Sequence, residues 1–432
     1  MSGGAQRPTL VRAISRFDLT AAIVNGVVGS AIFGYPGGQA ALTGQWSPLG
    51  YVLAGLGMFT VVLCFAEVAS RFRDTGGQYL YISEAFGPLV GFHAGWLFFW
   101  SRITALAANL ALLADSAARL LPVLEGQAPR LALLALVTLV LAAVNVAGVR
   151  QASWTINVFT VGKLLPLFLL IVLGLPQVRG QVLATQAVEH HQWTAAILLL
   201  VFAYGGFEAP LIAAGESRDP RRDAGPSLFV GLGIVAAVYV LVQFVVVGVL
   251  PRAGESKTAV ADAFGVLLGP AGVMLASVGA LVSTLGYSFG ATLQAPRLLF
   301  AMGERRDLPS LLARVHERFR TPHAAIVILA IVAFGLAAAG SFAAIAAFSA
   351  EVRLVVYAAT CAALLVLRQK RPHEVPGFRL RAAPVVASLG VLFCLWLLTA
   401  QSFQQAGVLL GLVVLGVVLR DLARREGARP GV

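Results

Sequence analysis

Glycine-rich runs interrupt two apolar segments that are each long enough to cross a membrane. The first interruption lies at Gly29 in segment 17–42, and the second lies at Gly205-Gly206 in segment 193–216. Backbone N–H and C=O groups freed at membrane depth are tolerated only where they line a protein cavity or bind a ligand. A helix N-terminus offers N–H groups to an anion, and a helix C-terminus offers carbonyls to a cation. The two breaks therefore predict a site for a zwitterion.

The composition places these breaks in a membrane protein. Hydrophobic residues make up 58% of the chain, charged residues only 12%, and the mean hydropathy is +0.84. A soluble domain would carry about 25% charged residues. The net charge of +12 comes from short basic clusters between apolar spans, not from one basic face, so no nucleic acid is expected as a partner. The expected partner is a lipid bilayer.

The hydropathy pattern predicts an all-α polytopic membrane protein with about 12 transmembrane helices. They are expected at 17–42, 48–70, 88–121, 130–149, 153–176, 193–216, 227–250, 270–302, 323–340, 343–367, 382–400 and 404–420. Because interruptions occur in the first and sixth helices, a 5+5 inverted repeat is predicted. The whole chain, 1–432, is then a single membrane transport domain, with a first repeat at 17–176, an inverted second repeat at 193–367, and two additional helices at 382–420.

The distribution of basic residues predicts the orientation. Of the 32 lysines and arginines, 24 fall in segments that are cytoplasmic if the N-terminus is cytoplasmic, 5 fall in outside segments, and three fall within spans. Cytoplasmic loops carry the excess of lysine and arginine. Both termini are therefore predicted to be cytoplasmic, in a multi-pass protein of the cytoplasmic (inner) membrane.

Several motifs recur in the order that one transporter family shows. They are Gly29-Ser30-Ala31-Ile32-Phe33-Gly34-Tyr35-Pro36, Asp74-Thr75-Gly76-Gly77-Gln78-Tyr79, Gly162-Lys163-Leu164-Leu165-Pro166, Phe202 to Glu208 followed by Gly215-Glu216 and Asp219-Pro220, and Pro296-Arg297 with Asp307-Leu308-Pro309. With these motifs the chain resembles the amino acid/polyamine/organocation superfamily of amino acid permeases over nearly its whole length. The resemblance implies the leucine-transporter fold, with helices 1 and 6 broken.

The substrate site is expected at the two breaks. Its predicted residues are Ile23, Val27, Gly29, Ser30, Ala31, Ile32, Phe202, Ala203, Tyr204, Gly205 and Phe207. The N–H groups of Ser30, Ala31 and Ile32 are expected to hold a substrate carboxylate. Carbonyls near Ile23, Val27, Phe202 and Ala203 are expected to receive the ammonium, as the resemblance implies. Phe202 is expected to be the gating aromatic, a lid that closes over the substrate, although packing alone also explains such an aromatic side chain.

Lys163 is one of three lysines and lies well inside an apolar helix. The resemblance implies that its ammonium takes the position of a sodium ion in sodium-coupled relatives, near carbonyls of the first break and a hydroxyl of Ser283 or Thr284. Burial disfavours the charged form of a lysine, so proton coupling through Lys163 is predicted. Glu208, an intramembrane carboxylate, is expected either to gate the site or to cap the unwound backbone.

The sequence thus predicts a secondary active transporter that moves neutral amino acids by alternating access with proton-coupled uptake. Exchange of one amino acid for another is the alternative. Glu208 or Asp115 would admit a cationic substrate, and Arg102 would admit an acidic one. Glu351 and Arg353 are each expected to have a partner on another helix, and their roles are otherwise open. For Arg102, an ion pair with Glu351 or with Glu67 is one option.

Other classes of protein are disfavoured. The chain shows no clustered catalytic acids and histidines and no P-loop, so an enzyme is not expected. A channel would need a pore lined by repeated polar or carbonyl rings, and flux measurements distinguish it from a carrier, which saturates and is slow. His190-His191 lacks a third ligand at a useful spacing, so no metal or other cofactor is expected. The segment between helices 3 and 4 has no cysteine, so no disulfide-linked heavy chain is expected.

Overall fold

The computed structural model describes residues 15–72, 77–147, 152–178, 188–208, 210 and 220–428. The helices are α1 (Arg16–Val27), α2 (Ala31–Gly34), α3 (Pro36–Thr43), α4 (Ser47–Arg71), α5 (Gly77–Phe86), α6 (Pro88–Leu120), α7 (Gln127–Ala147), α8 (Ala152–Gly174), α9 (His190–Tyr204), α11 (Pro220–Val249), α12 (Ala259–Leu268), α13 (Pro270–Glu304), α14 (His323–Ala339), α15 (Phe342–Lys370), α16 (Ala383–Leu398) and α17 (Phe403–Ala428). The described part of the chain contains no strand, which confirms the all-α fold class.

All twelve expected membrane segments coincide with helices. Nine helical stretches of the described part are long and apolar enough to cross a membrane by length and composition. The other three expected segments correspond to α9, α14 and α16, which have 15, 17 and 16 residues. The inverted relation between the two repeats stays a prediction.

Two of the membrane helices are interrupted at the expected places. After α1 the backbone becomes extended at Val28 and resumes helix only at Ala31; we call residues 25–30, the end of α1 and this gap, break 1. After α9 the backbone is extended at Gly205, and Gly206 adopts φ +113°, a conformation that favours glycine. We call residues 203–207, the end of α9 and this gap, break 2.

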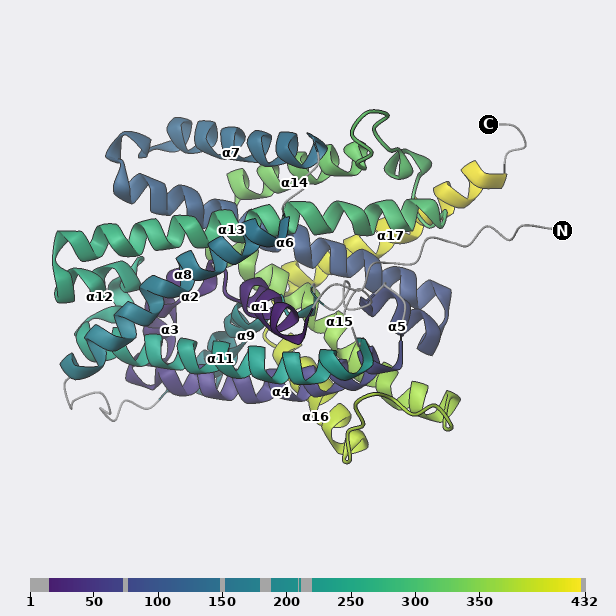
Figure 1. The fold of residues 1–432 in the computed structure, drawn as a ribbon, viewed down its shortest axis with the longest axis horizontal. Coiled ribbons are helices and arrows are strands. Elements are labelled where there is room, and N and C mark those ends of the chain that lie inside the picture. Colours follow the sequence, from purple (N-terminus) through teal and green to yellow (C-terminus); the bar gives the residue numbers. More distant parts are fainter. Residues whose placement is uncertain are drawn as a thin grey trace.

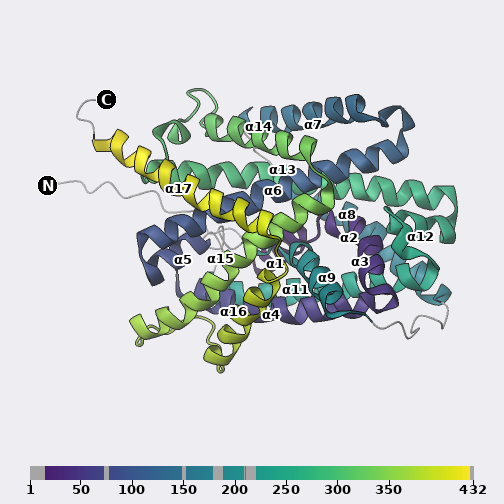
Figure 2. The ribbon, with the colours of Figure 1, turned by 180° about the vertical axis from the view of Figure 1, so that it is seen from behind.

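Long helices run along the longest axis of the molecule and enclose the two breaks. In Figure 1, α4, α6, α11 and α13 lie nearly parallel to that axis, and α1 and α9 lie between them. Figure 2 shows α15 crossing this bundle obliquely, with α17 against its outer side. α6 packs closely against α13 and α15, and 94% of its most apolar window is buried. The helices with the breaks are thus held inside the protein.

Two short helices that the hydropathy pattern did not predict mark opposite ends of the bundle. α12 lies at one end, and α5 lies at the other (Figure 1); we call these the α12 end and the α5 end. Each has 10 residues, too few for a membrane crossing. A search for long apolar segments could not detect them.

Some predicted features fall outside the described residues. These are Asp74, Thr75 and Gly76 of the second motif, Gly215-Glu216 and Asp219 of the fourth, and the basic residues Arg7, Arg12, Arg73, Arg150, Arg179, Arg218 and Arg429.

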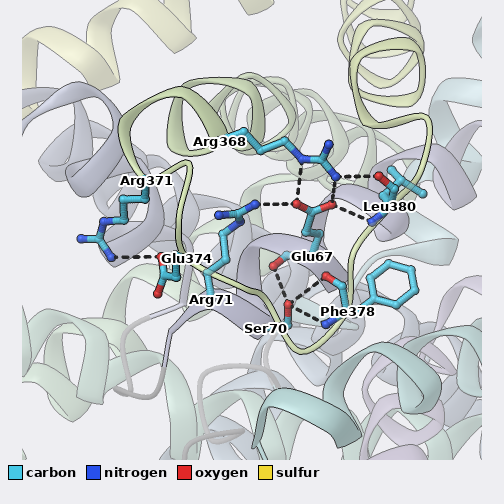
Figure 3. Close-up of polar contacts among 8 residues, drawn as sticks. All are labelled: Glu67, Ser70, Arg71, Arg368, Arg371, Glu374, Phe378 and Leu380. Carbon is cyan, nitrogen blue, oxygen red and sulfur yellow. Dashed lines mark hydrogen bonds and ion pairs between the residues drawn. The ribbon is translucent and has the colours of Figure 1, made fainter.

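At the α5 end, a buried carboxylate joins α4 to α15 and to the connector after α15 (Figure 3). Glu67 is fully buried and accepts hydrogen bonds from Arg71 Nη2 (2.7 Å), Arg368 Nε (2.8 Å) and Arg368 Nη2 (2.6 Å). The Leu380 N–H also donates to it (2.8 Å). One turn further on, Ser70 Oγ accepts from the Phe378 N–H (3.1 Å). We call Glu67, Ser70, Arg71, Arg368 and the 378–380 backbone the Glu67 cluster.

The Glu67 cluster closes the α5 end, because it ties a connector across the ends of two bundle helices. Glu67 and Arg71 lie in the last turns of α4, and charged side chains are seldom fully buried unless they are paired. Both side chains are buried, at 0% and 4% exposure, so they do not form a solvated face. The option of a Glu67–Arg102 pair is wrong, because Arg71 and Arg368 take the carboxylate.

We expect Glu67→Gln to lower the free energy of unfolding by about 3 kcal/mol, because it leaves two arginines without their charge partner in a buried place. Thermal unfolding of the detergent-purified protein measures this. The control is Glu84→Gln, which removes a half-exposed ion pair with Arg371 and is expected to change stability by less than about 1 kcal/mol. Equal melting temperatures for the two variants would show that the Glu67 cluster does not hold the α5 end.

Candidate functional site

The backbone groups of break 1 find partners on four other helices. Lys163 of α8 donates from Nζ to the carbonyls of Asn25 (2.6 Å) and Val28 (2.5 Å). Ser283 of α13 donates to the Gly29 carbonyl (3.0 Å), and Tyr239 of α11 donates to the Val27 carbonyl (3.1 Å).

The fourth partner is Asn109 of α6. Its Oδ1 accepts from the Ser30 N–H (3.1 Å), and its Nδ2 is held by the Ala105 carbonyl (2.8 Å). Side chains thus replace the helical hydrogen bonds that break 1 gives up.

This arrangement places the ammonium of Lys163 where the sequence expected it. The side chain is fully buried, and it forms no ion pair within the parts of the chain that are described. Ser283 reaches the neighbouring carbonyl, whereas Thr284 donates back to its own helix at Ala280 and Leu281. Of the two proposed hydroxyls, Ser283 is therefore the one that lies at the break. Its role in proton coupling stays a prediction, as does that of Lys163.

Break 2 is capped by a carboxylate from its own segment. Glu208 Oε2 accepts from the Gly206 N–H (2.8 Å) and from the Tyr357 hydroxyl (3.1 Å). Its other oxygen, Oε1, lies 3.4 Å from Arg353 Nε of α15. Of the two roles that the sequence left open for Glu208, this geometry is the capping one. It also gives Arg353 its partner on another helix, as expected.

The two breaks touch each other through glycine backbone. A methyl group at Gly26 would lie 2.9 Å from the Gly206 carbonyl oxygen, and one at Gly206 would overlap the Gly26 carbonyl. No residue with a side chain fits this approach without a backbone shift. Tyr239 adds a second link, since its hydroxyl lies 3.1 Å from the Val27 oxygen and 3.3 Å from the Ala203 oxygen.

A small buried cavity lies between the breaks. It is lined by Val27, Gly29, Ser30, Ala31, Asn109, Phe202, Gly205, Tyr287 and Arg353. Six of the eleven predicted substrate residues are in this set. Ser30 Oγ is buried and makes no hydrogen bond with any described residue. An unused hydroxyl beside a cavity is a ready partner for a ligand.

The other five predicted residues lie near the cavity without lining it. Ile23 packs against α11 at Gly231, and Tyr204 donates its hydroxyl to the Tyr51 carbonyl (2.9 Å). The Ala203 carbonyl faces Tyr239. Ile32 and Phe207 are fully buried in the core. Their predicted part in binding stays a prediction.

Aromatic side chains close the cavity at both ends. Toward the α12 end, Phe202 contacts the rings of Tyr35 and Phe342 at centroid distances of 5.9 and 6.2 Å. Toward the α5 end, Phe207 contacts Phe65 and Tyr357 at 5.3 and 5.5 Å. The Glu67 cluster follows the second group along α4, nearer the α5 end.

The remaining intramembrane charges lie away from the cavity. Arg102 donates to Gln294 (3.3 Å) and its guanidinium carbon lies 5.7 Å from the centre of the Tyr287 ring. Asp115 pairs with Arg130 at a partly exposed position, and Glu351 lies near Gln401. The option of an Arg102–Glu351 pair is therefore wrong.

Four residues at the site were missed as site residues: Asn109, Tyr239, Tyr287 and Arg353. Each is a polar side chain inside an apolar helix, which is a signal of a functional or structural role in a membrane protein. That signal does not reveal which helix face meets the breaks.

Within the described ranges, no group of three or more His, Cys, Asp or Glu side chains is placed to hold a metal ion.

The chain is similar in sequence to several known membrane transporters. The chain is 29% identical to the serine/threonine exchanger SteT of Bacillus subtilis over 417 aligned residues, and this alignment covers 91% of the chain and 93% of the relative. It is 27% identical to the methylthioribose transporter of the same organism, over 92% and 90% of the two chains. It is 29% identical to the human large neutral amino acids transporter small subunit 2, over 81% and 68%. Residues 14–411 match the amino acid permease family, and the chain therefore belongs to that family of membrane transporters.

Proposed function

We propose that this protein is a secondary active transporter that carries neutral amino acids across the cytoplasmic membrane by alternating access. The observation that carries the proposal is the closed cavity between two helix breaks that touch each other. Its walls offer backbone N–H groups on one side and carbonyls on the other. Relatives named for serine/threonine exchange and for large neutral amino acids support the substrate class.

An amino acid zwitterion fits the two kinds of backbone group. Its carboxylate takes the N–H groups at the start of α2, where Asn109 Oδ1 now accepts from Ser30. The hydroxyl of Ser30 supplies a further donor. Its ammonium faces the carbonyls of Val27 and Ala203, which Tyr239 shares in the structure. Charges at both helix ends are thereby complemented.

Charged substrates are less well matched to this cavity. Glu208 faces Arg353, so it is not free to hold a cationic side chain. Asp115 is paired with Arg130 and Arg102 contacts Gln294, both outside the cavity lining. The alternatives of a cationic or an acidic substrate therefore lose the residues on which they depended.

Alternating access follows from opening one end at a time. Separation of Phe202 from Tyr35 and Phe342 would open the cavity toward the α12 end, and release of the Glu67 cluster with Phe65 and Phe207 would open it toward the α5 end. By the positive-inside rule, the α5 end is the cytoplasmic one, where both termini are also proposed to lie. Closure at both ends excludes water from the loaded site.

We propose that Lys163 couples transport to protons. It is the buried cation nearest to break 1, and its only hydrogen bonds among the described residues are to the carbonyls of Asn25 and Val28. Loss of its proton removes the positive charge that these two carbonyls complement and so weakens the link between α8 and break 1; protonation and conformation are therefore linked. Exchange of amino acids with Lys163 as a fixed charge is the second candidate, which the relative named as an exchanger favours.

We expect Gly29→Val to reduce amino acid binding by at least about tenfold, because its side chain would point at Tyr287 and Asn109, 3.4 and 3.6 Å from its Cβ. Binding is measured by ligand-induced thermal stabilisation of the purified protein against the twenty amino acids. Gly38→Val, at an exposed position of α3 with open space around it, is the control and should bind like the parent. Undiminished binding by Gly29→Val would remove the cavity as the substrate site.

We expect Lys163→Ala to uncouple transport from protons while Lys370→Ala, a lysine outside the cavity at the end of α15, leaves coupling intact. In proteoliposomes with an acidic exterior, the parent should accumulate the best ligand, and an ionophore that collapses the gradient should abolish this accumulation. The variant should only equilibrate the ligand or not transport it. A parent that ignores the gradient but exchanges internal for external amino acid would establish the second candidate instead.

A further inference from the structure

Among the residues that the structure describes, Arg353 is the one charged side chain in the lining of the cavity. It comes from α15, is 1% exposed, and packs its guanidinium against Gly205 so closely that a methyl group there would overlap Nη1. The arginine therefore lies directly beside break 2. Any substrate that places its carboxylate and ammonium at the two breaks brings its side chain into contact with the rest of the wall, which includes Phe202, Tyr287 and this guanidinium.

The charge of Arg353 is balanced, but its hydrogen-bonding capacity is not used up by its carboxylate partner. Glu208 Oε1 lies 3.4 Å from Nε, and neither atom makes a hydrogen bond among the described residues. The other oxygen of Glu208 is occupied by the Gly206 N–H and the Tyr357 hydroxyl. A guanidinium has five N–H donors, so Arg353 keeps donors for a ligand in the cavity.

The free donors discriminate between substrate side chains. An oxygen acceptor beside the guanidinium gains a charge-assisted hydrogen bond, whereas a methyl group in the same place leaves buried donors without a partner. A carboxylate would add a second negative charge near Glu208, and an ammonium would face Arg353 itself. The cavity that Phe202, Tyr287 and Arg353 help to line is small, which favours a short side chain.

We propose that Arg353 is a specificity-determining residue that selects neutral amino acids with a short side chain ending in a hydrogen-bond acceptor, that is a hydroxyl or a carboxamide. This inference rests on the proposed function and narrows its substrate class. Glu208 then has two tasks: it caps break 2, and it keeps the selection in favour of uncharged acceptors by neutralising the arginine.

Isosteric pairs of amino acids test the proposal on the unmodified protein. Threonine and valine have the same shape and differ by a hydroxyl in place of a methyl group. We expect the purified parent to bind threonine at least about tenfold more tightly than valine in calorimetric titration, and serine more tightly than alanine. Equal affinity for threonine and valine would overturn this proposal and leave amino acid transport standing. A folded parent that binds no amino acid would overturn both.

The role of Arg353 itself is tested with the variant Glu208→Gln/Arg353→Met, which removes both charges together and so leaves no uncompensated buried ion. In this variant the affinities for threonine and valine should differ by no more than about twofold. The control is Arg102→Met, a second buried arginine that contacts Tyr287 from outside the lining, and it should keep the parent preference. A preference that survives in the double variant would overturn the assignment.

Glu208→Gln alone gives an independent test, in which an affinity is expected to rise and not to fall. With the arginine no longer neutralised, aspartate should gain at least about tenfold in affinity relative to asparagine. No gain would overturn the part assigned to Glu208. If neither Glu208 variant folds, the affinity ratios of the parent still decide whether the cavity selects for an acceptor.

Discussion

Every backbone group released by the two breaks must find a partner inside the protein, because the surrounding hydrocarbon supplies none. Most polar side chains around the site answer this requirement. Lys163, Ser283 and Tyr239 donate to the carbonyls of break 1, and Glu208 accepts from break 2. Since these side chains come from α8, α13, α11 and the chain after α9, the breaks join otherwise separate helices into one unit. A shift of any of these helices changes the hydrogen bonds of the site.

The same requirement explains why glycine is needed where the breaks meet. Gly26 and Gly206 bring two backbones into direct contact, and the positive φ of Gly206 turns its N–H toward Glu208. Arg353 packs in turn against Gly205 and pairs with Glu208. The charged pair, the cap and the backbone contact thus occupy adjoining positions. The affinity of the cavity and the stability of break 2 depend on the same few atoms.

The sequence predicted the features that lie within one segment. Glycines in apolar runs located both breaks, and the family resemblance implied that Lys163 lies near the carbonyls of the first. The sequence could not predict which faces of α6, α11, α13 and α15 meet the breaks, because helix rotation in a membrane is set by packing between helices that the apolar pattern does not encode. Asn109, Tyr239, Tyr287 and Arg353 were missed at the site for this reason. The helices α5 and α12 were missed because a span criterion detects only long segments.

The hydroxyl of Tyr239 has a single proton but lies within hydrogen-bonding distance of two carbonyls, one from each break. It can donate to only one of them at any instant, so the protein groups at this point include one more acceptor than donor. An ammonium, with three donors, would correct that imbalance and pull the two breaks together. On the proposed function, the loaded site is then stiffer than the empty one, and the substrate itself becomes a structural element during the crossing.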